Sequence, residues 1–233
     1  MGHAYRNTII FVILILAGVQ WGFYYSYTSK FPEFKGITNL THVHGMLMMT
    51  WLMLLIIQPF LILTGRQKLH RIIGKSSYVI GPLIIISLFL IGRQGYNGLV
   101  KDNPAQLARE ISVLDIRGFL TFGVFWALAM INRKNSDTHM RYMIGTAILA
   151  IGPGIGRGLM AAFNLDLVVS LTITDCIDIA IVGILLGFDI RRNRNYRPYL
   201  TILLIFIASA ILWQIRTTAP WQAFSGAWAA LFF

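Results

Sequence analysis

Seven long apolar segments constrain the fold of this chain more than any other feature. A helix that crosses a bilayer needs roughly twenty mainly apolar residues to span the hydrocarbon core. Only 12% of the residues are charged, which is about half the fraction found in soluble domains. The sequence therefore predicts an all-α integral membrane bundle and a single domain over residues 1–233. The predicted spans are 8–27, 42–63, 78–95, 112–131, 140–161, 167–188 and 199–216.

The first apolar segment is predicted to be a retained helix. It ends in Trp21, Tyr24, Tyr25 and Tyr27, which are typical of an interfacial aromatic belt and unlike the small residues of a signal-peptide cleavage site. The longest polar connection is expected between Tyr96 and Glu110. No repeats or low-complexity linkers separate the spans, so one compact bundle is expected.

The basic residues predict the orientation. With the N-terminus in the cytoplasm, twelve of the twenty Lys and Arg residues fall on the inner side, as the positive-inside rule requires. Seven spans then place the C-terminus outside. Helical spans of this kind favour the bacterial cytoplasmic (inner) membrane, because outer-membrane barrels are built from alternating strands. The lipid bilayer is the expected partner, whereas nucleic acid is not, since no basic soluble module is present.

Polar residues inside the spans are the candidates for function, because each is costly in a bilayer unless paired or hydrated. His42 and His44 begin the second span, where two such imidazoles reach one centre only if the first turn is irregular. One interpretation is a copper, zinc or haem ligand, since imidazole binds all three. The other is an interfacial histidine pair. His44 also starts a stripe with Met48, Trp51 and Gln58 at helical spacing.

Two further histidines precede the third and fifth spans on the inner side. His70 and His139 lie at the same predicted depth, which meets one condition for holding a haem between two imidazoles. Interfacial residues that bond helix ends or lipid phosphate would show the same pattern. The sequence leaves both interpretations open.

The fifth and sixth spans add charge and a kink. Pro153 stands among four glycines from Gly152 to Gly158, which predicts a kink and close approach of another backbone or a flat cofactor. Arg157 follows near the outer end, and Asp175 and Asp178 lie one turn apart in the sixth span. We expect at least one carboxyl to be protonated, paired with Arg157, or bound to a cation or water.

The remaining polar candidates gather in the outer half. Asp115 and Arg117 open the fourth span and Arg93 closes the third. Together with His44, Arg157 and Asp175 they are predicted to line a polar pocket, although interfacial snorkelling also explains the two arginines. The single cysteine, Cys176, excludes a disulfide framework and is predicted to be a small core residue.

Several motifs carry a family resemblance. The segments His42–Gly45 through Trp51 to Gln58-Pro59, Leu69–Arg71 with Gly74, and His139–Met143 resemble uncharacterised bacterial polytopic membrane proteins classed as a domain of unknown function. The resemblance covers nearly the whole chain. More distantly, helices two to five resemble the cytochrome b561 core. That resemblance implies haem b with His70 and His139 as inner ligands and His44 as an outer ligand. The fourth span offers no second outer histidine, so the resemblance supports one inner haem.

Three classes of function follow. The first is a redox protein whose haem exchanges electrons with a quinone, another small acceptor or a membrane protein partner at the outer pocket. The second is a proton-coupled carrier that uses the intramembrane aspartates. The third comprises metal-dependent hydrolases and accessory or assembly subunits without catalysis. No catalytic residue can be assigned, because no general base is recognisable beside the histidines. A retinal photoreceptor is not expected, since the last two spans contain no lysine.

Overall fold

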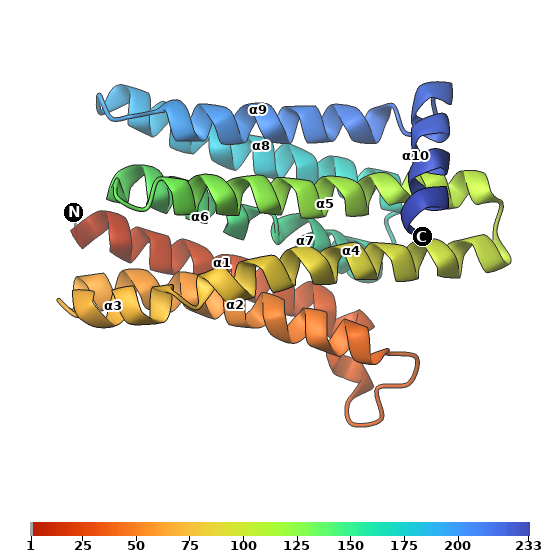
Figure 1. Cartoon of the computed structure of the whole chain (residues 1–233), viewed down its shortest axis with the longest axis horizontal. Coiled ribbons are helices and arrows are strands. Elements are labelled where there is room, and N and C mark those ends of the chain that lie inside the picture. The colour runs from red at the N-terminus through yellow and green to blue at the C-terminus, as the bar shows by residue number, and fades with distance from the viewer. Residues whose placement is uncertain (1) are drawn as a thin grey trace.

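The computed structural model describes residues 2–233, which form ten α-helices and one short 3-10 helix. The long helices run side by side along one axis, and the two termini lie at opposite ends of the bundle (Figure 1). The elements are α1 (Gly2–Ser26), η1 (Thr28–Lys30), α2 (Asn39–Leu63), α3 (Gln67–Gly74), α4 (Ser77–Asp102), α5 (Ala105–Ile131), α6 (Ser136–Ile148), α7 (Ile151–Phe163), α8 (Leu167–Arg191), α9 (Arg197–Gln214) and α10 (Ala219–Phe232).

The described residues contain seven helical stretches long and apolar enough to cross a membrane, which confirms the predicted number and order of spans. The largest difference lies at the predicted polar connection from Tyr96 to Glu110. There, α4 continues to Asp102 and α5 begins at Ala105, so only two residues separate them. Pro104 explains the break, because it has no amide hydrogen and cannot continue α4, whereas it suits the start of α5.

The predicted kink of the fifth span interrupts the helix between α6 and α7, although Ser136–Phe163 remains one stretch long enough to cross a membrane. The break falls at Leu149 and Ala150, three to four residues before Pro153. A proline inside a helix clashes with the carbonyl four residues earlier and leaves it without a donor. The distortion therefore appears in the turn that precedes Pro153.

Glycines bring α7 against α1. A Cβ on Gly22 would overlap the carbonyl oxygen of Gly154, and a Cβ on Gly154 would lie 2.8 Å from the Cα of Val19. A Cβ on Gly158 would in turn overlap the ring of Trp21. The glycine-rich segment thus serves the close approach of another helix backbone.

The core joins side chains of most long helices. Trp51 is fully buried, and its Nε1–H donates to Thr146 Oγ1 at 3.0 Å. Its ring meets Phe122 edge-on at 5.3 Å between centroids. By contrast, Cys176 is exposed, so the prediction that it is a core residue is wrong. Cys176 lies two residues from both Thr174 and Asp178, whose side chains α8 buries. Because residues two positions apart point to opposite sides of a helix, Cys176 faces outward.

The helix α10 has no counterpart among the predicted spans. It lies across the end of the bundle that holds the C-terminus, transverse to the long helices (Figure 1). Trp221 Nε1–H donates to the carbonyl oxygen of Arg109 at 2.8 Å, and the hydroxyls of Ser225 and Ser112 are 2.7 Å apart. These contacts fix α10 on α5.

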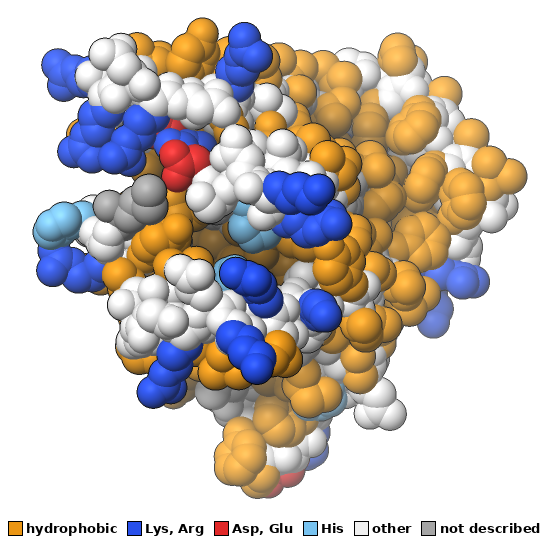
Figure 2. Space-filling view, turned by 60° about the vertical axis from the view of Figure 1, so that its left-hand side comes forward, with side chains coloured by type: hydrophobic (Ala, Val, Ile, Leu, Met, Phe, Trp, Pro, Cys, Tyr) orange, Lys and Arg blue, Asp and Glu red, His pale blue; other side chains and the backbone are white. Residues whose placement is uncertain are grey.

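The end of the bundle that holds the N-terminus is the basic end. It carries the turns between α2 and α4, between α5 and α6, and between α8 and α9. Lys and Arg side chains gather around this hollowed face, with hydrophobic and histidine side chains inside it (Figure 2). We call the opposite end, which carries α10, the far end.

Candidate functional site

His139 is positioned at the basic end by the first turns of α6. Its Nδ1 lies 2.8 Å from the carbonyl oxygen of Ala129 on α5. A carbonyl only accepts, so Nδ1 carries the proton and Nε2 keeps its lone pair. Metal-bound histidines usually show this arrangement, in which the second nitrogen donates to a carbonyl or carboxylate.

His70 lies on the short helix α3 and contacts Gln58 of α2. With its amide nitrogen turned to His70, Gln58 donates to the His70 carbonyl oxygen at 3.1 Å and to Nδ1 at 2.5 Å, while its oxygen accepts from the Gly74 amide at 3.2 Å. In this arrangement the proton of a neutral His70 ring sits on Nε2. For His70 to bind a metal through Nε2, the Gln58 amide must turn so that its oxygen accepts from Nδ1–H of the His70 ring.

The structure brings His70 and His139 together at the basic end. Both side chains are partly buried, and the imidazoles are near enough for their charges to interact. They come from α3 and α6, two helices that do not pack along each other.

His42 and His44 have separate partners at the far end of α2. Tyr27 Oη lies 2.5 Å from His42 Nδ1, and the ring of Phe34 stands edge-on to the same imidazole at 4.9 Å. His44 Nδ1 lies 2.9 Å from Ser87 Oγ on α4. Because Ser87 donates its hydroxyl proton to the Ile84 carbonyl, His44 Nδ1–H is the donor and its Nε2 is free. Within residues 2–233, no group of three or more His, Cys, Asp and Glu residues is placed to hold a metal ion.

Arg157 joins His44 and Asp115 in the far half of the bundle. Its guanidinium is near enough to both for their charges to interact, and it donates to the Pro153 carbonyl at 2.9 Å. Asp115 lies against Gly92, where an added Cβ would be 2.6 Å from the Asp115 Cβ. Three of the predicted pocket residues therefore form one polar cluster, which we call the far cluster.

Asp175 belongs to a different pair. Arg117 Nη1 donates to Asp175 Oδ2 at 3.1 Å and to the Ser209 carbonyl at 3.3 Å. The expected partner Arg157 is thus replaced by an arginine from α5. Arg93 lies outside both groups, since its Nε donates to the Phe233 carbonyl at 3.3 Å.

Asp178 continues a buried polar stripe along α8. Ser170, Thr174 and Asp178 are spaced by four residues and are at most 5% exposed. Thr174 bonds its own helix backbone, whereas Ser170 Oγ and Asp178 Oδ1 have no hydrogen-bond partner among the described residues. Unpartnered buried oxygens on one stripe indicate a place for a bound proton or for ordered water.

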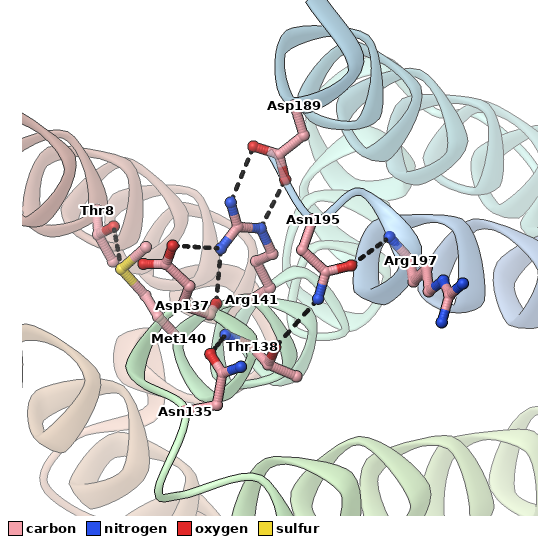
Figure 3. Close-up of polar contacts among 9 residues, drawn as sticks. All are labelled: Thr8, Asn135, Asp137, Thr138, Met140, Arg141, Asp189, Asn195 and Arg197. Carbon is pink, nitrogen blue, oxygen red and sulfur yellow. Dashed lines mark hydrogen bonds and ion pairs between the residues drawn. The ribbon is translucent and has the colours of Figure 1, made fainter. Parts of the chain in front are cut away.

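The tightest ion pair of the described chain was not predicted from the sequence. Arg141 of α6 donates from Nε and Nη2 to the two carboxylate oxygens of Asp189 on α8, at 2.6 and 2.9 Å (Figure 3). Its Nη1 donates to the Asp137 carbonyl at 2.7 Å. Both side chains are almost fully buried. The sequence signal was an aspartate in the last turns of an apolar span, where most aspartates need a cation.

Comparison with family models, curated proteins and solved structures finds no match for this chain.

Proposed function

We propose that this chain is a multi-pass protein of the bacterial inner membrane that holds haem b between His70 and His139 and transfers electrons. The hydrogen bond from His139 Nδ1–H to the Ala129 carbonyl supports the proposal most, because it leaves Nε2 as a free ligand aligned by its neighbour. His70 supplies the second imidazole from α3. Haem, when bound, supplies the one-electron chemistry, and the chain supplies ligation and burial.

Gln58 is the residue that sets the state of His70. When its oxygen faces Nδ1, it accepts the ring proton, strengthens the basicity of Nε2 and fixes the plane of the ring. With the amide turned the other way, Gln58 bonds the His70 carbonyl oxygen and the Gly74 amide instead. Haem ligation by His70 would therefore exchange these backbone bonds for one bond to the ring.

The far cluster is the proposed meeting place with a quinone. A quinone carbonyl accepts hydrogen bonds, which the Arg157 guanidinium can donate. Its reduction also takes up protons, and His44 and Asp115 can exchange them. This assignment replaces Asp175, which pairs with Arg117.

The first test is a reduced-minus-oxidised absorption spectrum of the purified protein, expressed with haem available, with iron measured on the same sample. We expect a sharp reduced α-band and iron near one per chain. His139→Ala and His70→Ala should abolish the band. His3→Ala is the matched control, because His3 is exposed at the same end, where its ring bonds Arg6. A colourless protein without iron would refute the haem proposal.

A proton-coupled carrier is the second candidate, and Asp178 favours it. A charged carboxylate with an unpartnered oxygen is costly at this depth, and a bound proton removes that cost. The stripe to Ser170 would lead the proton toward the far end. In proteoliposomes, Asp178→Asn should abolish proton flux. Asp166→Asn should preserve it, because Asp166 caps α8 at the surface and asparagine caps equally well. Flux that persists in Asp178→Asn contradicts this candidate.

A further inference from the structure

A cavity of about 300 Å³ opens at the basic end, away from the two histidines. Its walls come from α1, α6, α8 and α9. Among the long helices, α1 packs on α2 and α7, whereas α8 packs on α7 and α9. The cavity occupies the space between α1 and α8, with α6 behind it.

The lining of the cavity includes two arginine side chains whose charges no acidic side chain of residues 2–233 neutralises. Arg141 and Asp189 line it but cancel each other in their ion pair. Arg192 and Arg194 line it as well, and neither belongs to an ion pair within residues 2–233. Their charges therefore face the cavity and the water beside it.

The turn between α8 and α9 holds both arginines in place. The Arg192 amide donates to the Phe188 carbonyl at 3.2 Å, and the Arg194 amide donates to the Asp189 carbonyl at 2.9 Å. The Arg192 guanidinium also lies over the Phe188 ring, 5.7 Å from its centroid. Because the Asp189 carboxylate is fixed by Arg141, the buried ion pair anchors the turn that carries the cations.

The rest of the lining divides into a polar rim and an apolar wall. Asn7 and Thr8 contribute hydrogen-bonding groups on α1. Below them the wall is apolar, formed by Phe11, Met140, Ile144, Leu185 and Phe188. A ligand that fits carries an anionic, hydrogen-bonding head and an apolar tail.

We propose that this cavity binds an anionic phospholipid of the leaflet at the basic end, with its phosphodiester on Arg192 and Arg194 and its acyl chains along the apolar wall. Basic pockets between transmembrane helices on the cytoplasmic side bind such headgroups. A free phosphate shares the anionic chemistry but cannot use the wall. The proposal stands independently of the haem and carrier proposals, because it uses neither the histidines nor Asp178.

The test is native mass spectrometry of the full chain released from detergent with phosphatidylglycerol and phosphatidylcholine of identical acyl chains. We expect phosphatidylglycerol to be retained preferentially. The double variant Arg192→Gln/Arg194→Gln should weaken its binding about 30-fold, since each arginine near an anionic surface contributes roughly fivefold. Phosphatidylcholine binding should change little.

The control is Lys134→Gln/Arg197→Gln, which removes the same charge from exposed positions at the same end. Neither residue lines the cavity, and the Arg197 side chain points away from the Arg141–Asp189 pair (Figure 3). If the control variant binds phosphatidylglycerol equally weakly, positive surface charge in general explains the binding, and the proposal is overturned. Unchanged preference in the cavity variant would also overturn it.

Two further arms separate lipid from free anion. Phe11→Trp narrows the apolar wall without changing charge and should weaken phosphatidylglycerol retention, with thermal unfolding used to verify that the variant is folded. Inorganic phosphate should not displace the lipid at millimolar concentration. Displacement by phosphate, with no effect of Phe11→Trp, would assign the cavity to a soluble anion and refute the lipid proposal.

Discussion

The ion pair between Arg141 and Asp189 allows a sharp stability prediction. Arg141 is 2% exposed and Asp189 is 6% exposed, so water has little access to either charge. Asp189→Asn keeps the volume and one oxygen but leaves the Arg141 charge uncompensated. Breaking a buried pair from one side costs about 3–5 kcal/mol. Within residues 2–233, the only other acid paired with Arg141 is Asp137, whose carboxylate is 4.0 Å away and 67% exposed, so it cannot replace Asp189.

The assay is reversible unfolding by sodium dodecyl sulfate in mixed micelles. Asp189→Asn should lower the free energy of unfolding by about 3 kcal/mol or more, whereas Asp137→Asn should lower it by less than about 1 kcal/mol, because exposed pairs contribute little. The double variant Arg141→Met/Asp189→Leu removes both charges and should recover most of the loss. If Asp189→Asn costs no more than Asp137→Asn, the buried charge is solvated by another route and the reasoning fails.

Two other substitutions test the packing in the same unfolding assay. Gly22→Ala should destabilise the protein by about 1–3 kcal/mol, because its Cβ would overlap the backbone of α7; Gly183→Ala, where a Cβ meets open space, should cost nothing. Trp51→Phe should cost about 1 kcal/mol more than Trp126→Phe, since Trp51 donates to Thr146 while the Trp126 Nε1–H has no hydrogen-bond partner among the described residues. A loss of stability at Gly183, or equal losses at the two tryptophans, would contradict these expectations.

The spans were predictable because hydropathy averages over about twenty residues and tolerates errors at either end. The ends depend on single residues instead. Polar residues from Tyr96 to Asp102 look like a loop, but a helix can extend past a membrane without apolar side chains, and α4 continues until Pro104 stops it. The helix α10 was missed because its 14 residues are too few for the twenty-residue apolar run that identifies a membrane span.

Partner choice among the charges was harder to predict, because it depends on how each helix is rotated. The sequence suggested Arg157 as one possible partner for Asp175 or Asp178, but Asp175 pairs with Arg117 of α5. A rotation of 100° per residue means that a shift by one position redirects a side chain to another neighbour. The depth of a residue in the bundle can be estimated from its sequence distance to the ends of its helix. The direction in which its side chain points depends on how the helix packs against its neighbours.

The glycines of α7 show how packing fixes that rotation. Gly154 and Gly158 face Val19 and Trp21 of α1, so the side of α7 with these glycines is committed to α1. Arg157, one residue before Gly158, holds its guanidinium over the Phe23 ring of α1, 4.8 Å from the centroid, and its charge is near enough to interact with those of His44 and Asp115. The composition of the far cluster thus follows from where α7 can approach another backbone. Bulk on the glycine face should therefore disturb the far cluster and leave the Arg141–Asp189 pair, on the other side of the α6–α7 break, in place.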